Sequence, residues 1–188
     1  MPTSPAPSPL RGEGWGEGAT EARPPDAALT PTLSRREREK KLDPPTVIVL
    51  ASGRGERFAA TGGTVHKLRA ALGDRTVLEH TLDAVRASGL PWHLEDVGHP
   101  GMGDSSGAAV RATADARGWL ILPGDLPLVQ PDTLRAIAAA LQGRDVVVPL
   151  CRGQRGHPVA FAAALGPALM QLAGPQGAAS IVRAHAVL

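Results

Sequence analysis

The sequence predicts an α/β sandwich built around a mostly parallel sheet. Two observations lead to this fold class. Apolar, β-branched runs of strand length recur from residue 46 onward, and stretches with the apolar spacing of a helix separate them. The 188 residues are enough for one domain of ordinary size with an appendage, and for a sizeable core.

The first strand and helix of the predicted domain follow directly from these patterns. Residues 46–51 form a continuous apolar run after Pro45, which predicts a strand buried on both faces. Apolar residues at 78, 82 and 85 then share one helix face, so a helix is expected over 77–87, closed by Gly89.

The later elements continue the alternation. Short apolar runs predict strands over 119–122, 146–150 and 159–161. Pro131 stands where a first helical residue would, with Leu134, Ile137 and Leu141 behind it on one face. A last helix is expected over 178–187.

The first 45 residues differ in composition from the rest. They hold nine of the 18 prolines and balance seven basic against seven acidic side chains, without periodic apolar positions. Such a segment cannot bury enough surface to offset its ordering entropy, so 1–45 is predicted to be disordered and 46–188 to be the folded domain. Parts of this leader resemble translated repetitive intergenic DNA, which places the expected native start further along.

Composition excludes several classes of function. A single cysteine, Cys151, excludes a disulfide framework and a cysteine zinc site and favours a reducing, cytoplasmic compartment. The longest apolar runs are far shorter than the roughly 20 residues that span a bilayer, so no membrane partner is expected. The net charge of +2, without a basic stripe and with few aromatic residues, gives no reason to expect a nucleic-acid partner.

The loop after the first strand is a candidate phosphate site. Gly53 and Gly55 allow close backbone approach, so that several N–H groups can converge on an anion. The only lysine among the domain's basic residues, Lys67, follows this loop and suits a position that needs a compact ammonium. The alternative is a plain tight turn with Lys67 in water.

A second loop places one carboxylate, Asp125, directly after a buried strand. Burying an acid costs free energy unless it has a partner, and Mg²⁺ held by a carboxylate and phosphate oxygens is a usual one. An aspartate that caps a turn is the alternative. Ligands of such sheets bind beyond the carboxyl ends of the strands, where both loops lie.

Six segments in order resemble the MobA-like NTP transferases, and within them the molybdenum cofactor cytidylyltransferases most closely. They are LASGRGERF at 50–58, Lys67, LEHTL at 78–82, GMGDS at 101–105, PGDLP at 123–127 and RGHP at 155–158. The resemblance implies a three-layer α/β/α Rossmann-like nucleotidyltransferase sandwich over 46–188. It also implies transfer of a nucleotidyl group from an NTP to a phosphorylated acceptor, with Mg²⁺ and release of pyrophosphate.

The resemblance also assigns roles to individual residues. Lys67, Arg57 and Asp125 would be catalytic, with Asp125 holding Mg²⁺. Arg155, His157 and Pro158 would lie on the acceptor side, although His157 could equally be structural. The nucleotide would be bound by Leu50, Ala51, Ser52, Gly53, Arg54, Gly55, Gly101, Gly103, Asp104 and Ser105. The other histidines, at 66, 80, 93, 99 and 185, show no metal-ligand spacing and receive no role.

Three departures from the family pattern predict a compact domain with reduced activity. The segment 90–100 is short, which predicts fewer strands in the sheet than the family usually has. Pro175 stands where relatives have an acidic residue. The chain ends before the acidic segment that closes the sheet in relatives, as a C-terminally truncated domain would.

Ser52 matches neither the cytidylyl nor the guanylyl pattern of the family, but RGHP looks more like the cytidylyl branch and favours CTP. The resemblance implies a phosphorylated acceptor such as molybdopterin cofactor. Two alternatives stay open: a transferase for a sugar phosphate or another phosphate ester, and a non-catalytic nucleotide-binding partner of a molybdoenzyme.

Overall fold

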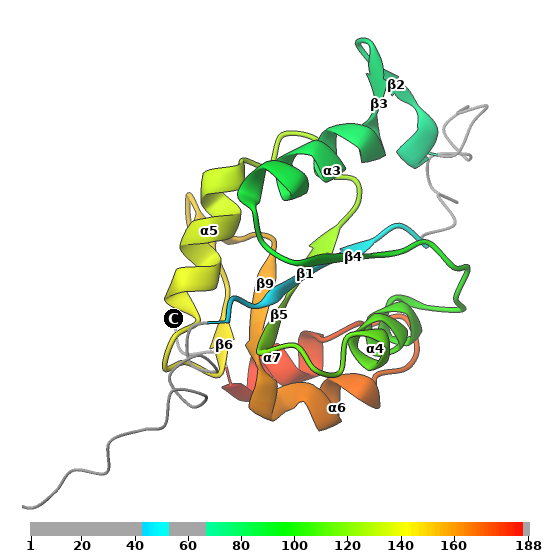
Figure 1. Cartoon of the computed structure of the whole chain (residues 1–188). Coiled ribbons are helices and arrows are strands. Elements are labelled where there is room, and N and C mark those ends of the chain that lie inside the picture. The colour runs from blue at the N-terminus through cyan, green and yellow to red at the C-terminus, as the bar shows by residue number, and fades with distance from the viewer. Residues whose placement is uncertain (1–42, 53–66, 186–188) are drawn as a thin grey trace, which may run out of the picture. The chain divides into compact units, whose positions relative to one another are not determined.

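The central sheet has five strands in the order β4-β1-β5-β9-β6 (Figure 1). The computed structural model describes residues 43–52 and 67–185, all within the unit Arg35–Leu188. The strands are β1 (Thr46–Leu50), β4 (Trp92–Glu95), β5 (Gly118–Pro123), β6 (Val146–Val147) and β9 (Val159–Ala162). β1 pairs in parallel with β4 and β5, and β9 runs antiparallel between β5 and β6.

Helices cover both faces of this sheet (Figure 1). One side carries α3 (Val77–Ser88) and α5 (Pro131–Ala140), and the other α4 (Met102–Ala112), α6 (Gly166–Met170) and α7 (Ala179–His185). Successive strand residues alternate between the two cores, because side chains along a strand point to opposite faces. Val47 and Val49 pack with α3 and α5, whereas Ile48 packs with α4. The fold is therefore the predicted three-layer α/β/α sandwich.

Local sequence explains where the main helices begin and end. Thr76 and Glu79 form a capping box at the start of α3, and Gly89 closes it in the left-handed conformation with φ 71°. α5 begins at Pro131, which needs no hydrogen bond from its nitrogen at the first helical position. The helices predicted over 77–87 and from residue 131 are thus confirmed.

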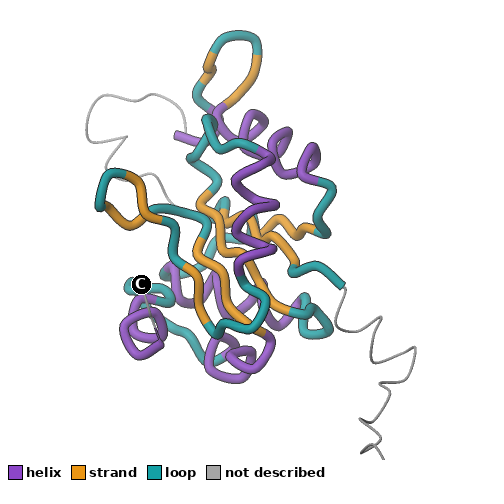
Figure 2. Tube along the Cα trace, turned by 90° about the vertical axis from the view of Figure 1, so that its left-hand side faces the viewer, coloured by secondary structure: helices purple, strands orange, loops and turns teal. Residues whose placement is uncertain are grey.

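Two small hairpins project from the sandwich. β2 (Ala71–Leu72) and β3 (Arg75–Thr76) form the loop beyond α3 at the top of Figure 2, after the short helix η1 (Lys67–Arg69). In the segment of chain that connects β6 to β9, β7 (Leu150–Cys151) pairs with β8 (Gln154–Arg155). The strand predicted over 146–150 is wrong beyond Val147, because Pro149 has no N–H for the ladder and the chain turns into this hairpin.

The remaining predictions are confirmed with small changes. The strands expected over 46–51, 119–122 and 159–161 are present within a residue or two as β1, β5 and β9. The last helix, predicted over 178–187, is present as α7 within the described residues, and 186–188 lie outside them. A further short helix, η2 (Ala163–Leu165), joins β9 to α6. The sequence did not predict β4, α4 or α6, and the first two of these lie within 92–112. In the part of the chain that the structure describes, no helix is long and apolar enough to span a membrane.

Candidate functional site

The carboxyl ends of β4, β1 and β5 are tied together at one edge of the sheet. The Ala51 N–H donates to the Glu95 carbonyl at 2.8 Å, and the Gly124 N–H donates to the Leu50 carbonyl at 2.9 Å. A side chain at residue 124 would meet the Leu50 oxygen at 3.0 Å, so glycine permits this close approach. The strand ends that precede the two predicted loops are therefore neighbours.

Ser52 is the last described residue of the first loop, and its hydroxyl contacts α4. Its Oγ shares a 2.5 Å hydrogen bond with Oγ of Ser105, which is almost fully buried in the first turn of that helix. Gly101 is the N-cap of α4, and its carbonyl accepts a hydrogen bond from the Ser105 hydroxyl. The structure thus joins two of the predicted nucleotide segments. Gly53, Arg54, Gly55 and Arg57 lie outside the described residues.

Lys67 and Asp125, which lie far apart in the sequence, form an ion pair between Nζ and Oδ2. Lys67 begins η1, which the buried Leu68 anchors, and Asp125 follows β5 through Gly124. Their side chains are 44% and 32% exposed, so both groups are accessible from solvent. The residue predicted to neutralise the triphosphate and the residue predicted to hold the metal ion are therefore in direct contact.

A residue that received no role in the sequence positions the Asp125 loop. The Thr81 hydroxyl donates to the Gly124 carbonyl at 3.0 Å and to the Val77 carbonyl at 3.2 Å, and the residue is fully buried. This contact fixes the peptide that carries Asp125 onto α3. The available signal was a polar residue on the otherwise apolar face of that helix.

The acceptor-side residues divide between two environments. Arg155 lies exposed in β8 of the small hairpin, whereas Pro158 is buried and follows His157 through a cis peptide bond. Partial burial lowers the pKa of His157, and the charge of Asp125 and a hydrogen bond with the Ile121 backbone oppose this shift. The charge of Asp125 thus acts on His157, and both His157 and Arg155 are exposed to solvent.

A buried carboxylate lies beside this edge and was missed by the sequence analysis. Glu95 ends β4 next to Leu50, with its side chain only 8% exposed. Nε2 of His99 lies 3.2 Å from one carboxylate oxygen, and Nε2 of His93 lies 3.7 Å from the other. The pair with His99 spans the connection from β4 to α4. The sequence feature that could have indicated this pair is a glutamate followed four residues later by a histidine.

The donor set at Asp125 fits a metal that is shared with a ligand. Among the described residues, no group of three or more His, Cys, Asp or Glu side chains could hold an ion. Mg²⁺ and similar ions commonly bind proteins through one or two carboxylates and complete their shell with water and phosphate oxygens. The exposed Asp125 carboxylate meets that requirement, so a divalent ion would enter with phosphates.

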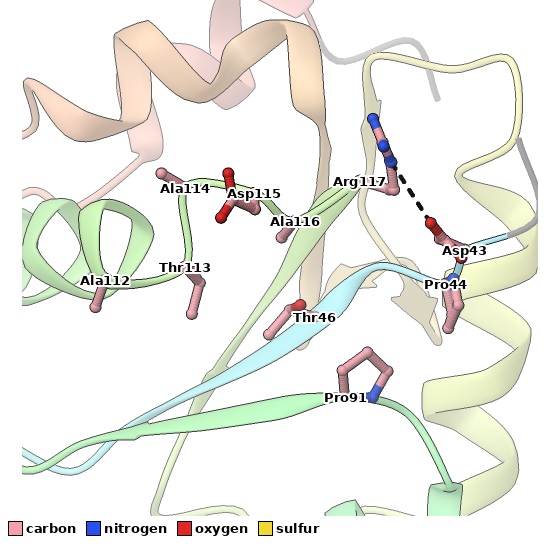
Figure 3. A pocket seen from close by; sticks show the side chains of 10 residues that line it. All are labelled: Asp43, Pro44, Thr46, Pro91, Ala112, Thr113, Ala114, Asp115, Ala116 and Arg117. Atoms are coloured by element: carbon pink, nitrogen blue, oxygen red, sulfur yellow. Dashed lines mark ion pairs between the residues drawn. The ribbon is translucent and has the colours of Figure 1, made fainter. Parts of the chain in front are cut away.

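A hollow of about 390 Å³ opens at the opposite, amino ends of the strands (Figure 3). Its lining side chains are Asp43, Pro44, Thr46, Pro91, Ala112, Thr113, Ala114, Asp115, Ala116 and Arg117. An ion pair of 3.8 Å joins Arg117 to Asp43 across one side of it. None of the predicted site residues that the structure describes lines this hollow. Because ligands of such sheets bind beyond the carboxyl ends, the candidate site lies at the Lys67 and Asp125 edge.

A Rossmann-like sandwich with these loops at its carboxyl edge defines a nucleotidyltransferase-type fold. The chain belongs to the MobA-like NTP transferase domain family, whose model matches residues 82–188. This match includes the segments around Ser105, Asp125 and His157. The first loop and Lys67 precede it.

Two proteins of known structure and one curated protein are among those similar to this chain. Rv0371c from Mycobacterium tuberculosis H37Rv is 25% identical with a TM-score of 0.62, covering 73% of this chain and 81% of that one. A second structure of Rv0371c is a complex with manganese. A nucleotidyl transferase from Methanothermobacter thermautotroptrophicus is 29% identical with a TM-score of 0.56, covering 69% and 76%.

The curated protein is the bifunctional protein GlmU of Alkalilimnicola ehrlichii, 30% identical over 120 residues. The match covers 52% of this chain and 25% of that protein, so the chain spans about a quarter of its length.

Proposed function

We propose that this chain is a metal-dependent nucleotidyltransferase that moves a nucleotidyl group from an NTP to a phosphorylated acceptor and releases pyrophosphate. The observation that carries this proposal is the ion pair between Lys67 and Asp125 at the carboxyl edge of the sheet. An ammonium beside a carboxylate suits a ligand that brings both a metal ion and phosphate oxygens. Family membership supports the same class of reaction.

The proposed reaction needs no strong base. An oxygen of the acceptor phosphate, already ionised, attacks the α-phosphorus, and the bond from that phosphorus to the bridging oxygen breaks. The electron pair leaves with pyrophosphate. The protein then has two tasks, which are to align the attacking oxygen and to stabilise charge on the phosphates.

The residues predicted to be catalytic would divide these tasks between them. Lys67 would turn from Asp125 to the triphosphate and neutralise its oxygens, and Arg57 would assist it. Asp125 would hold a divalent ion, which when bound supplies charge stabilisation at the phosphates. Mg²⁺ is the proposed ion, and the manganese complex of Rv0371c supports a divalent metal in this fold.

The base and the acceptor are proposed from the sequence motifs. The segment 155–158 favours CTP, and the family resemblance favours a phosphorylated acceptor such as molybdopterin cofactor, which would make a molybdoenzyme a possible partner. Ser52 and Ser105 would border the nucleoside, since their hydroxyl pair lies at the end of β1. His157 would reach the acceptor from the side of the Asp125 loop.

Pyrophosphate release from a panel of substrates tests the proposal. The purified chain would be incubated with each common NTP, Mg²⁺ or Mn²⁺, and either a pterin phosphate or a sugar phosphate. Turnover with CTP and the pterin phosphate is expected, and turnover with only the sugar phosphate would support the first alternative. Nucleotide binding without turnover on any acceptor would instead support the non-catalytic binding partner. Asp132→Asn is a matched control for Asp125→Asn, because Asp132 is exposed in α5.

A further inference from the structure

Two hydrogen bonds join the first turn of α4 and the turn after α6. The Gly103 N–H donates to the Gly174 carbonyl at 2.8 Å. The Gly174 N–H in turn donates to Oδ2 of Asp104 at 2.9 Å. Both polar backbone groups of Gly174 are therefore bonded to the same helical turn, and Asp104 supplies the only side chain among these four groups.

Steric contacts fix the register of these two segments. A side chain at residue 103 would place its Cβ 2.6 Å from the Ala173 oxygen, and one at Gly101 would collide with the Gly174 carbonyl. About two helical turns beyond Gly103, the Arg111 side chain donates a hydrogen bond to the Met170 carbonyl. Because residues 170–174 run alongside α4 from Gly101 to Arg111, a displacement of this segment or of the helix would break their contacts with each other.

The same turn of α4 also reaches the end of β1. Ser105 follows Asp104 directly, is 2% exposed, and shares its hydroxyl hydrogen bond with Ser52. The direction of the Ser105 side chain depends on the orientation of this turn, which the contacts with Gly174 hold in place. Loss of the contacts with Gly174 would therefore disturb the hydrogen bond between Ser105 and Ser52.

We propose that Asp104 is a positioning residue, which orients Ser105 and Ser52 for the nucleotide by holding Gly174. This inference rests on the proposed function, and it gives Asp104 a role different from direct contact with the nucleoside. The carboxylate acts as a hydrogen-bond acceptor for a backbone N–H, and its position in the first turn of α4 also suits the helix dipole. An acceptor of the same shape without charge would keep the contact.

Two substitutions separate this role from a direct one. Asp104→Ala removes the acceptor, so KM for the nucleotide is expected to rise about tenfold while kcat changes much less. Asp104→Asn keeps an oxygen that can accept from Gly174 and is expected to restore most of the affinity. Ser106→Ala is the matched control, because that hydroxyl bonds only within α4, to the Met102 carbonyl. If Asp104→Asn loses as much affinity as Asp104→Ala, charge at the ligand is what matters and the inference is overturned.

Hydrogen exchange in the free protein gives a readout that needs no nucleotide. Asp104→Ala is expected to speed exchange at Gly174, in 101–106 and at the end of β1, while Asp104→Asn leaves exchange near the wild-type rate. Unchanged exchange at the end of β1 in Asp104→Ala would overturn the inference. A wild-type chain that binds no nucleotide would refute the proposed function alone, because exchange still tests the role of Asp104.

Discussion

The Lys67 ammonium is paired with the Asp125 carboxylate, so each predicted functional group is the other's partner in the ligand-free protein. A divalent ion that binds Asp125 would therefore compete with Lys67 for the carboxylate. Half-exposed ion pairs are worth about 0.2–1 kcal/mol, which corresponds to an effect of up to about fivefold on binding.

Lys67→Met is accordingly expected to tighten Mn²⁺ binding in the absence of nucleotide by up to about fivefold. Titration of Mn²⁺ followed by electron paramagnetic resonance measures this affinity. Arg69→Gln removes the same charge from the same turn and serves as the control. Weaker Mn²⁺ binding by Lys67→Met than by the control would contradict the competition between lysine and metal.

Asp125→Ala and Lys67→Ala are expected to lower kcat by about two to three orders of magnitude, because each removes charge stabilisation from the phosphates. Both side chains are substantially exposed, so the free energy of unfolding should change by less than about 1 kcal/mol. Kinetics and chemical denaturation of the same samples check the two effects. Wild-type rates of pyrophosphate release in either variant would exclude a catalytic role for that residue.

Thr81→Val removes the hydroxyl that holds the Gly124 carbonyl and leaves that buried acceptor without this donor. The expected cost is about 1–3 kcal/mol of stability, together with a lower kcat because the Asp125 loop loses its support. Urea denaturation and steady-state kinetics measure the two changes. Thr133→Val, at an exposed position of α5, controls for the substitution itself. Equal stability of the two variants would mean that the Thr81 hydroxyl does not support the loop.

The lowered pKa of His157 predicts a stability that depends on pH. Its folded-state pKa lies below the ordinary value of 6.5, so the unfolded chain takes up the proton first as the pH falls. This contribution to stability is complete above about pH 6.5 and decreases below it. His157→Asn should therefore lose less stability than the wild type between about pH 7.5 and about pH 5. Parallel unfolding curves with the same pH dependence would contradict this account of His157.

The sequence predicted the sandwich because its central strands are continuous apolar runs that can only be buried, such as 46–51 and 119–122. It did not predict β4, whose four residues include Trp92, His93 and Glu95 and show no apolar run. It also did not predict α4, since glycines at 103 and 107 are poor helix formers. In the structure these glycines allow the backbone of 170–174 to pack closely against the helix.

The site was predictable as far as strand polarity determines it. Lys67 and Asp125 come after β1 and β5, which are parallel neighbours in the sheet, and the loops after parallel strands meet at one edge. The contacts of Thr81 with Gly124 and of Asp104 with Gly174 join segments 43 and 70 residues apart, and no local pattern encodes them. Tertiary packing alone creates these supports.

Transfer of label from CTP tests the central claim most directly. With CTP labelled at the α-phosphate, a divalent metal and a phosphorylated acceptor, the wild-type chain should place label on the acceptor and release one pyrophosphate for each label transferred. Asp125→Asn should lose this transfer and Asp132→Asn should keep it. A folded wild-type chain that transfers no label from any common NTP to any acceptor would contradict the claim.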